Sequence, residues 1–423
     1  EWVDALEPLV GQLRVTCGLQ PATLSKFEAG LLAVGLVIPG PPELGPTEVT
    51  AASTMGELGY AVIRRQLAVL GAKEPGTRLG EDPEELHDMR VATRRLRAAL
   101  DLFAEVLPVR AQTHREELGW LGSVLGAVRD LDVQLQDLGD LSDTQAGWSA
   151  SALHTDGHDP LTDLFALLQR DREKARTDML AALDSVRWER LFAGLCSMVR
   201  QGPPRRALAT RVPAAIGMPD LVVARHDKVA KAARRARRSG VVSDFHRLRI
   251  RCKRLRYSLE FSADVYDGGT ARYVRRLTAL QDELGLLQDA EVASTRLAEL
   301  ATGEAHLPPA TVFVMGALAE RDHRSERRLL ARLPKMTKRV TGGAWDELVE
   351  LMEERRADSV AAQPPARRTL RAVPSPPPPA HASPDSHPAL PPPSPPPLPA
   401  PAAPNLTALG PLEPPSPSSG QGE

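Results

Sequence analysis

The sequence predicts an all-α protein made of two similar helical halves, followed by a proline-rich tail without a fold of its own. Three observations predict this fold class. Apolar residues recur at spacings of three and four from about residue 52 to residue 357, where Ala, Leu, Arg and Glu dominate. One block of this region occurs a second time further along the chain. Aromatic residues make up only 4% of the sequence, which argues against a β-fold.

The first segment, residues 1–38, is short and partly apolar, and a linker at residues 39–49 follows it. The linker is rich in proline and glycine, which interrupt helices and strands. No apolar run reaches the roughly 18–20 residues that span a bilayer. The three cysteines, Cys17, Cys196 and Cys252, lie far apart. Their number and spacing predict neither a disulfide framework nor a zinc site, and they favour a cytoplasmic location.

The helical domain is predicted at residues 50–357, with halves at about residues 50–200 and 220–357. Prolines and glycines within residues 201–219 separate the two halves. An amphipathic pattern over residues 161–183 is typical of a helix that buries one face. We therefore expect each half to bury its apolar stripes in a helical core.

The tail, residues 363–423, contains more than half of the 39 prolines and few large apolar residues. Such a composition cannot bury enough apolar surface to fold, so we expect disorder with polyproline II character. A ligand role for SH3- or WW-like domains is one interpretation. The favoured interpretation is that the tail is a passive extension without a binding role.

The repeated block predicts an internal duplication. "HDMRVATRRLRAAL" (87–100) aligns with "HRLRIRCKRLRYSL" (246–259), and the same offset continues without a gap to residues 133 and 292. Helical propensity alone would not keep a histidine, a glycine and an aspartate in register. The identical pairs include His87/His246, Arg90/Arg249, Arg95/Arg254, Arg97/Arg256, Gly126/Gly285 and Asp130/Asp289. We expect two similar halves that pack about a pseudo-two-fold axis.

Each copy places a basic stripe on one helical face. At 100° per residue the stripe covers an arc of about 80°, and leucines such as Leu96 and Leu255 fall on the opposite side. A solvated face normally interleaves acids at i,i+4, and these stripes do not. The stripes consist of His87, Arg90, Arg94 and Arg97 in the first copy and His246, Arg249, Lys253, Arg256 and Tyr257 in the second.

An anion-binding role is therefore favoured over a solvated face. The chain has a formal net charge of only -1, but its charge is segregated. Residues 225–257 hold 13 basic residues against Asp227 and Asp244. This segment adds Lys231, Arg234 and Arg238 to the candidate binding residues. Arginine supplies a planar fork of donors that suits phosphate oxygens.

A polyanion without bases fits the stripes best. Recognition of nucleic acid would also use aromatic side chains for stacking, and Tyr257 is the only aromatic residue on either stripe. Inorganic polyphosphate is the expected partner. A nucleic-acid-binding protein and a phosphohydrolase remain alternatives.

The histidines, His87 and His246, are expected to donate to phosphate or to a neighbouring side chain that orients the arginines. No phosphate-binding loop supports a phosphoacceptor role, and His-x-x-Arg does not suit a metal. Direct contact with phosphate would strengthen binding below the ordinary histidine pKa of about 6.5. The repeated aspartates, Asp130 and Asp289, could cap a helix, orient an arginine or ligate a cation, and the orienting role is favoured. Neither catalytic residues nor a cofactor are predicted.

The two blocks, His-x-x-Arg-Val-x-x-Arg-Arg-Leu-Arg and His-x-x-Arg-Ile-x-x-Lys-Arg-Leu-Arg-Tyr, resemble the two halves of a CHAD domain (conserved histidine α-helical domain) over about residues 50–357. The resemblance implies two four-helix bundles related by internal two-fold symmetry, and a basic central channel that binds polyphosphate without catalysis. An association with polyphosphate granules, regulation of a fused enzyme and phosphate sensing are the cellular roles that stay open. The stripe residues would line the channel, with Arg95 and Arg254 at its edge. One departure from the repeat is Ala98, which stands where the second copy has Tyr257.

A second resemblance concerns "GLQPATLSKFEAGLLAVGL" (18–36), which is similar to the carboxyl end of a CYTH domain, the triphosphate tunnel fold. The resemblance includes the pair Ser25-Lys26. The metal-binding Glu-x-Glu-x-Lys strand of that family is absent from this sequence. Residues 1–38 are therefore expected to be a CYTH remnant, and a longer parent protein with a full tunnel could hydrolyse triphosphates.

Overall fold

The computed structural model describes residues 16–17, 33–35, 42–144, 160–303 and 307–363. Most of the CYTH-like segment and the whole of the proline-rich tail beyond residue 363 lie outside these described residues. The described part is helical and contains no strand, only an isolated bridge between Thr54 and Pro213. None of its helices is both long and apolar enough to cross a membrane. The predicted all-α class is confirmed.

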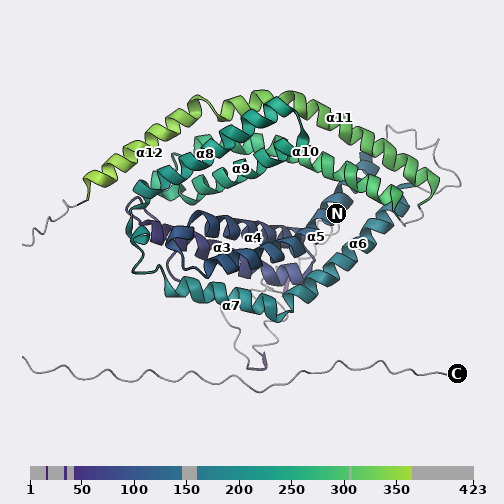
Figure 1. Ribbon diagram of the computed structural model, residues 1–423. Helices are drawn as coiled ribbons and strands as arrows, with labels where there is room; N and C mark the ends of the chain where they lie inside the picture. Colours follow the sequence, from purple (N-terminus) through teal and green to yellow (C-terminus); the bar gives the residue numbers. More distant parts are fainter. Residues whose placement is uncertain (1–15, 18–32, 36–41, 145–159, 304–306, 364–423) are drawn as a thin grey trace, which may run out of the picture. The chain divides into compact units, whose positions relative to one another are not determined.

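Within residues 42–363, as far as the structure describes them, five helices in the first half are followed by five equivalent helices in the second (Figure 1). Helices α3 and α8, and likewise α4 and α9, begin at positions separated by the offset of the sequence repeat, so the duplication extends to the fold. The first half contains α3 (Met55–Leu79), α4 (Pro83–Leu102), α5 (Ala111–Thr144), α6 (Pro160–Leu183) and α7 (Val186–Gln201). The second half contains α8 (Ala214–Ser239), α9 (Val242–Phe261), α10 (Ala271–Thr302), α11 (Pro309–Val340) and α12 (Gly343–Ala361).

In each half, the fourth helix of the predicted bundle is broken in two. Helix α6 stops at Leu183 and α7 begins at Val186, while α11 stops at Val340 and α12 begins at Gly343. The first break has a clear cause, because the Ser185 side chain caps α7 by accepting a hydrogen bond from the backbone N–H of Trp188. Figure 1 shows that the chain bends at each break, so that α6 with α7 and α11 with α12 each form an arc along the outside of the helical domain.

Local signals start the helices that carry the basic stripes. Asp82 caps α4 by accepting from the N–H of Glu84, and Pro83 occupies the first turn, where no N–H is needed. Helix α3, which packs on α4, begins with a capping box of Thr54 and Glu57. It ends at Gly80, whose φ of 73° lies in the left-handed region that favours glycine.

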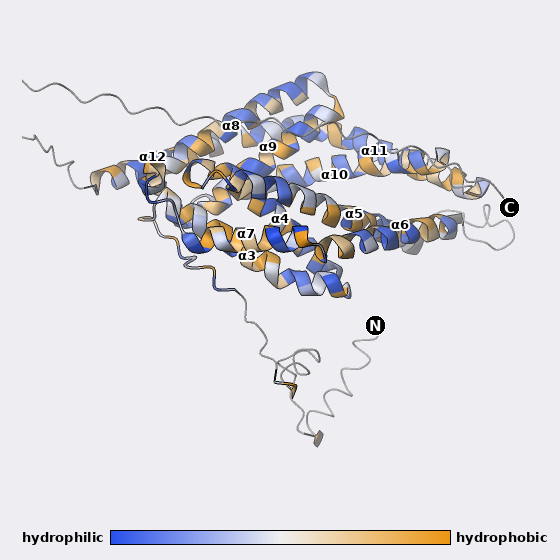
Figure 2. Ribbon diagram, turned by 60° about the horizontal axis from the view of Figure 1, so that its bottom comes forward, coloured by the Kyte–Doolittle hydropathy of each residue, from blue (hydrophilic) through white to orange (hydrophobic). Residues whose placement is uncertain are grey.

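The apolar faces of α4 and α9 form the centre of the main core, as their amphipathic patterns predicted. Met89 and Leu96 on α4 and Leu248 and Leu255 on α9 are fully buried in one continuous apolar cluster. Figure 2 shows the alternation of apolar and polar faces along these helices. Burial of this face fixes the rotation of each helix, so the polar stripe must point elsewhere.

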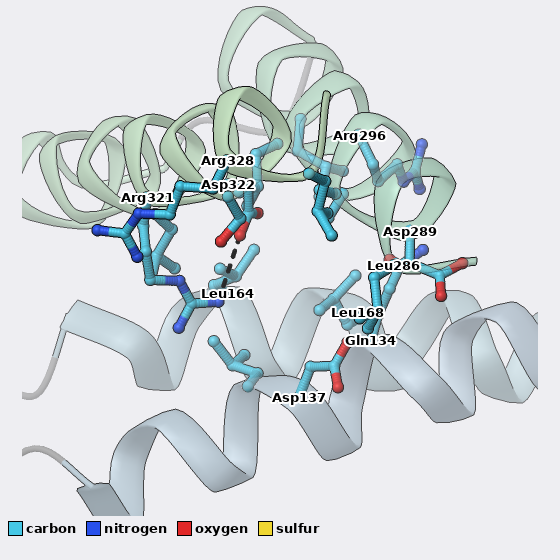
Figure 3. Close-up of a pocket in the computed structure, with 18 of the residues that line it drawn as sticks. Gln134, Asp137, Leu164, Leu168, Leu286, Asp289, Arg296, Arg321, Asp322 and Arg328 are labelled. Carbon is cyan, nitrogen blue, oxygen red and sulfur yellow. Dashed lines mark hydrogen bonds and ion pairs between the residues drawn. The ribbon is translucent and has the colours of Figure 1, made fainter. Parts of the chain in front are cut away.

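The halves also meet at a second, smaller apolar cluster. It contains Leu164 and Leu168 of α6, which line the pocket in Figure 3, together with Met315 and Leu318 of α11. An ion pair of 2.7 Å between Arg296 of α10 and Asp171 of α6 lies across the same junction. The halves are thus connected both through α4 and α9 and through the far ends of α6 and α11.

Candidate anion-binding site

Five cations from the two halves come together between α4 and α9. The pKa of Lys253 reflects how close these cations are to one another. Burial lowers this pKa to about 7, and the positive charges of the neighbouring arginines contribute to the decrease. Burial likewise lowers the pKa of Arg94, and Arg90, Arg249 and Arg256 add to that effect. We call this set the basic cluster: Arg90, Arg94, Arg249, Lys253 and Arg256.

The basic cluster is short of acceptors. The Nε atoms of Arg94, Arg249 and Arg256 are buried without a hydrogen-bond partner among the described residues. Arg256 Nε lies 3.4 Å from Glu260 Oε1, which is an ion pair by distance but not a well-aligned hydrogen bond. A buried donor without a partner costs about 1–3 kcal/mol. Oxygen atoms of an anion would satisfy these donors and relieve the repulsion between the cations.

Two acids approach the basic cluster. Asp130 of α5 pairs with Arg90 at 3.0 Å, which confirms its predicted role of orienting an arginine. Its repeat partner Asp289 has a raised pKa because it is buried, although Arg249 and Lys253 counteract that effect. Both carboxylates neutralise part of the basic charge, and Asp130 also holds the Arg90 guanidinium group in place.

The repeated glycines have a physical reason in the same contacts. A Cβ built on Gly126 would lie 3.5 Å from Arg90 Nε, and one built on Gly285 would lie 3.6 Å from Arg249 Nη2. The Arg90 and Arg249 guanidinium groups therefore lie directly over α5 and α10 where the side chain is missing. Any side chain longer than alanine would compete with them for this space.

The two histidines are half-buried and differ in their contacts. His246 Nδ1 makes a hydrogen bond with Gln288 Oε1 on α10. His246 also lines a cavity of about 510 Å³ together with Gln288 and with Asp130 of the other half. No hydrogen-bond partner of His87 is found among the described residues. His246 therefore contacts a neighbouring side chain, but among the described residues Gln288 is bonded to Glu291 and not to an arginine, so the predicted roles of both histidines stay predictions.

The remaining predicted residues lie around the basic cluster or away from it. Arg97 is exposed, and its guanidinium approaches Gly119 on α5. Tyr257 is buried rather than open, with the guanidinium carbons of Arg95 and Arg256 at 5.4 and 5.5 Å from its ring centroid. Three residues, Lys231, Arg234 and Arg238, are exposed on α8, and no contact joins them to the basic cluster. Their role in binding stays a prediction.

The paired arginines Arg95 and Arg254 are placed differently from each other. Arg95 Nη1 of the first half pairs with Glu260 Oε2 of the second half at 2.6 Å, so it connects α4 to α9. Arg254 instead lines a separate cavity, together with Asp101 and Arg225. The sequence interpretation overlooked Glu260, although the repeat has an acid, Asp101, at the equivalent position.

Replacing Glu260 with Gln is expected to lower the free energy of unfolding by about 1–3 kcal/mol. Glu260 neutralises Arg95 and Arg256 together, and all three side chains are about three-quarters buried. The matched control is Asp264→Asn, which breaks an exposed ion pair with Arg65 and should change stability by less than about 1 kcal/mol. Chemical denaturation of both variants provides the measurement. Equal losses in the two would show that Glu260 does not join the halves.

The fold and the basic cluster together define a duplicated, all-helical domain with charged residues from both copies in one place. The chain belongs to the CHAD domain family, whose sequence model matches residues 61–298. The crystal structure of the CHAD domain from the plant Ricinus communis is similar, with 30% identity, coverage of 69% of this chain and 93% of that chain, and a TM-score of 0.55.

A second solved structure, PptA from Streptomyces chartreusis, shares the fold. It is 21% identical, covers 68% of this chain and 100% of its own, and has a TM-score of 0.52. No curated protein matches the chain. The family model lies within the helical domain, and the comparisons do not show the CYTH remnant expected at residues 1–38.

Proposed function

We propose that this protein binds inorganic polyphosphate through the basic cluster, without making or breaking a bond. The observation that carries the proposal is the set of buried guanidinium Nε donors on Arg94, Arg249 and Arg256 that have no acceptor among the described residues. The CHAD family is linked to polyphosphate binding in general, which supports the same conclusion.

The arrangement suits a chain of phosphates better than a single one. Cations from two helices of different halves contribute to the basic cluster, and the exposed Arg97 extends it along α4. A polymer can contact several of these donors at once, and each charge-assisted contact adds to affinity without reading a sequence. The phosphates would replace the missing acceptors.

Nucleic acid is a weaker candidate because the basic cluster offers no stacking surface. Tyr257, the one aromatic residue of the stripes, is buried and packs against Phe261, with ring centroids 6.0 Å apart. Single-stranded nucleic acid would lose the stacking energy that such proteins normally use.

The favoured cellular setting is the cytoplasm, with an association with polyphosphate granules.

A titration of the full chain with long-chain polyphosphate, duplex DNA and RNA tests the proposal. At about 50 and 200 mM salt, polyphosphate should bind at least tenfold more tightly than either nucleic acid, and all affinities should fall with salt. Nucleic-acid affinity equal to that for polyphosphate would replace the proposal with nonspecific nucleic-acid binding. Release of inorganic phosphate in the presence of a divalent cation would indicate a hydrolase instead.

A further inference from the structure

A cavity lined by basic side chains lies on a different face of α9 from the basic cluster. Its volume is about 650 Å³, within the range of small-molecule sites. Met55, Phe103 and Val106 contribute apolar, buried side chains to its wall. The basic side chains that line it are Arg225, Lys228, Arg251 and Arg254. Neither Lys228 nor Arg251 belongs to the basic cluster or to the stripes.

The internal repeat explains why this cavity is open. In the second half, Tyr257 and Phe261 pack under Arg95, with ring centroids 5.4 and 5.3 Å from its guanidinium carbon. The equivalent positions in the first half are Ala98 and Leu102, and Leu102 lines the cavity together with Arg254. Both side chains are smaller than the aromatic residues at the same positions of the second half, so less volume is filled beside Arg254.

The repeat has an acid at equivalent positions of the two halves, and this acid has different ion-pair partners in each half. Glu260 pairs with Arg95, but its repeat partner Asp101 pairs with Arg115 at 2.8 Å and with Arg225 at 3.3 Å. Arg254 therefore lacks the partner that its twin has. The asymmetry produces both an opening and an unpaired cation.

The remaining charges leave the cavity with an excess of positive charge. Among the described residues, no acid pairs with Lys228, Arg251 or Arg254. Of the acids that line the cavity, Asp101 is paired as above and Asp220 pairs with Arg356 at 2.6 Å, so the exposed Glu105 is the one left without a cation. Unpaired cations beside a buried apolar wall suit a ligand that is anionic at one end and apolar at the other.

We propose that this cavity binds a phosphorylated small molecule with an aromatic or apolar body, of about the size of a nucleotide. Its phosphates contact Lys228, Arg251 and Arg254, and its body packs on the apolar wall formed by Met55, Phe103 and Val106. This site is distinct from the basic cluster, because Arg254 projects from α9 about 100° away from Lys253. Its occupation does not depend on whether the protein binds polyphosphate.

Calorimetric titration of the full chain with ATP tests the proposal, with inorganic tripolyphosphate as the probe that lacks the apolar body. ATP is expected to bind at one site with an affinity that saturation with long-chain polyphosphate leaves unchanged within about twofold. Tripolyphosphate should bind this site at least about tenfold more weakly, because it cannot use the apolar wall.

Two variants locate the site. Lys228→Ala combined with Arg251→Ala removes two charged contacts and should weaken ATP binding by at least about tenfold. Ala98→Tyr combined with Leu102→Phe restores the aromatic pair of the other half, should fill the cavity and should abolish ATP binding. Neither variant should change long-chain polyphosphate binding by more than about twofold. Displacement of ATP by polyphosphate, ATP affinity unchanged in Lys228→Ala/Arg251→Ala, or no ATP binding at all would overturn the proposal.

Discussion

Arg94→Met combined with Arg249→Met is expected to lower the affinity for polyphosphate by about 100- to 10,000-fold, since each charge-assisted hydrogen bond contributes about 1.5–3 kcal/mol. The same variant is expected to make the free protein more stable. Both guanidinium groups carry buried, unpaired Nε donors and lie among like charges. An apolar side chain of similar length removes the cost of a buried donor without a partner, so the free energy of unfolding should rise by about 1–3 kcal/mol.

The measurement is a polyphosphate titration together with chemical denaturation of the ligand-free variant. A matched control is Arg324→Met combined with Arg327→Met on α11, which removes the same charge from exposed side chains. The control should lose less than about tenfold in affinity and change little in stability. Loss of both affinity and stability in the Arg94/Arg249 variant would mean that these arginines are structural. Unchanged affinity would remove the basic cluster from the proposed function.

Polyphosphate binding is expected to weaken as the pH rises above about 7. Lys253 has a pKa of about 7 in the free protein because of burial and of the arginines around it, and Asp289 is an acid that interacts electrostatically with this lysine. A bound polyanion favours the charged amine and raises this pKa, so binding above pH 7 takes up a proton. If the bound pKa approaches the ordinary lysine value, affinity falls by about 30-fold between pH 6 and 8.5.

Stability of the free protein should change in the opposite direction. The pKa of Lys253 is about 7 when folded and about 10.4 when unfolded, so between these values the unfolded chain holds more protons. Stability from this group therefore rises with pH across that window, and it is lowest where the amine is charged in both states. Denaturation at pH 6 and pH 9 measures this effect.

Lys253→Arg is the control for both pH effects, because arginine stays charged at every pH used. The variant should retain its affinity at pH 8.5 and show a flatter pH profile. The variants His87→Asn and His246→Asn separate any contribution of the two imidazoles from that of Lys253. An unchanged pH dependence in Lys253→Arg would contradict the assignment to Lys253.

The sequence predicted the fold class, the duplication and the members of the basic cluster, because these depend on periodic patterns. Period 3.6 places Leu96 and Leu255 on the buried faces of their helices and Arg94 and Lys253 on the opposite, basic faces. Patterns within one helix are therefore sufficient for these features.

Contacts between helices could not be predicted in the same way. The sequence grouped Arg95 with Arg254, but Arg95 pairs with Glu260 while Arg254 lines a cavity, because the surrounding positions of the repeat have diverged. Tyr257 lies on the basic stripe by helical angle, yet the packing of Phe261 and Arg95 buries it. Such outcomes depend on which side chains the partner helix presents.

The placement of corresponding residues from both repeats in one basic cluster has an evolutionary consequence. A single ancestral half could assemble the same cluster only by pairing with an identical copy, and every substitution would then appear twice. Fusion into one chain freed the copies to diverge, since Arg94 could remain an arginine while its twin became Lys253. Arg94 now keeps its charge at every physiological pH, whereas the charge of Lys253 changes with pH. A symmetric dimer of identical halves could not combine these two properties, because both copies would carry the same residue.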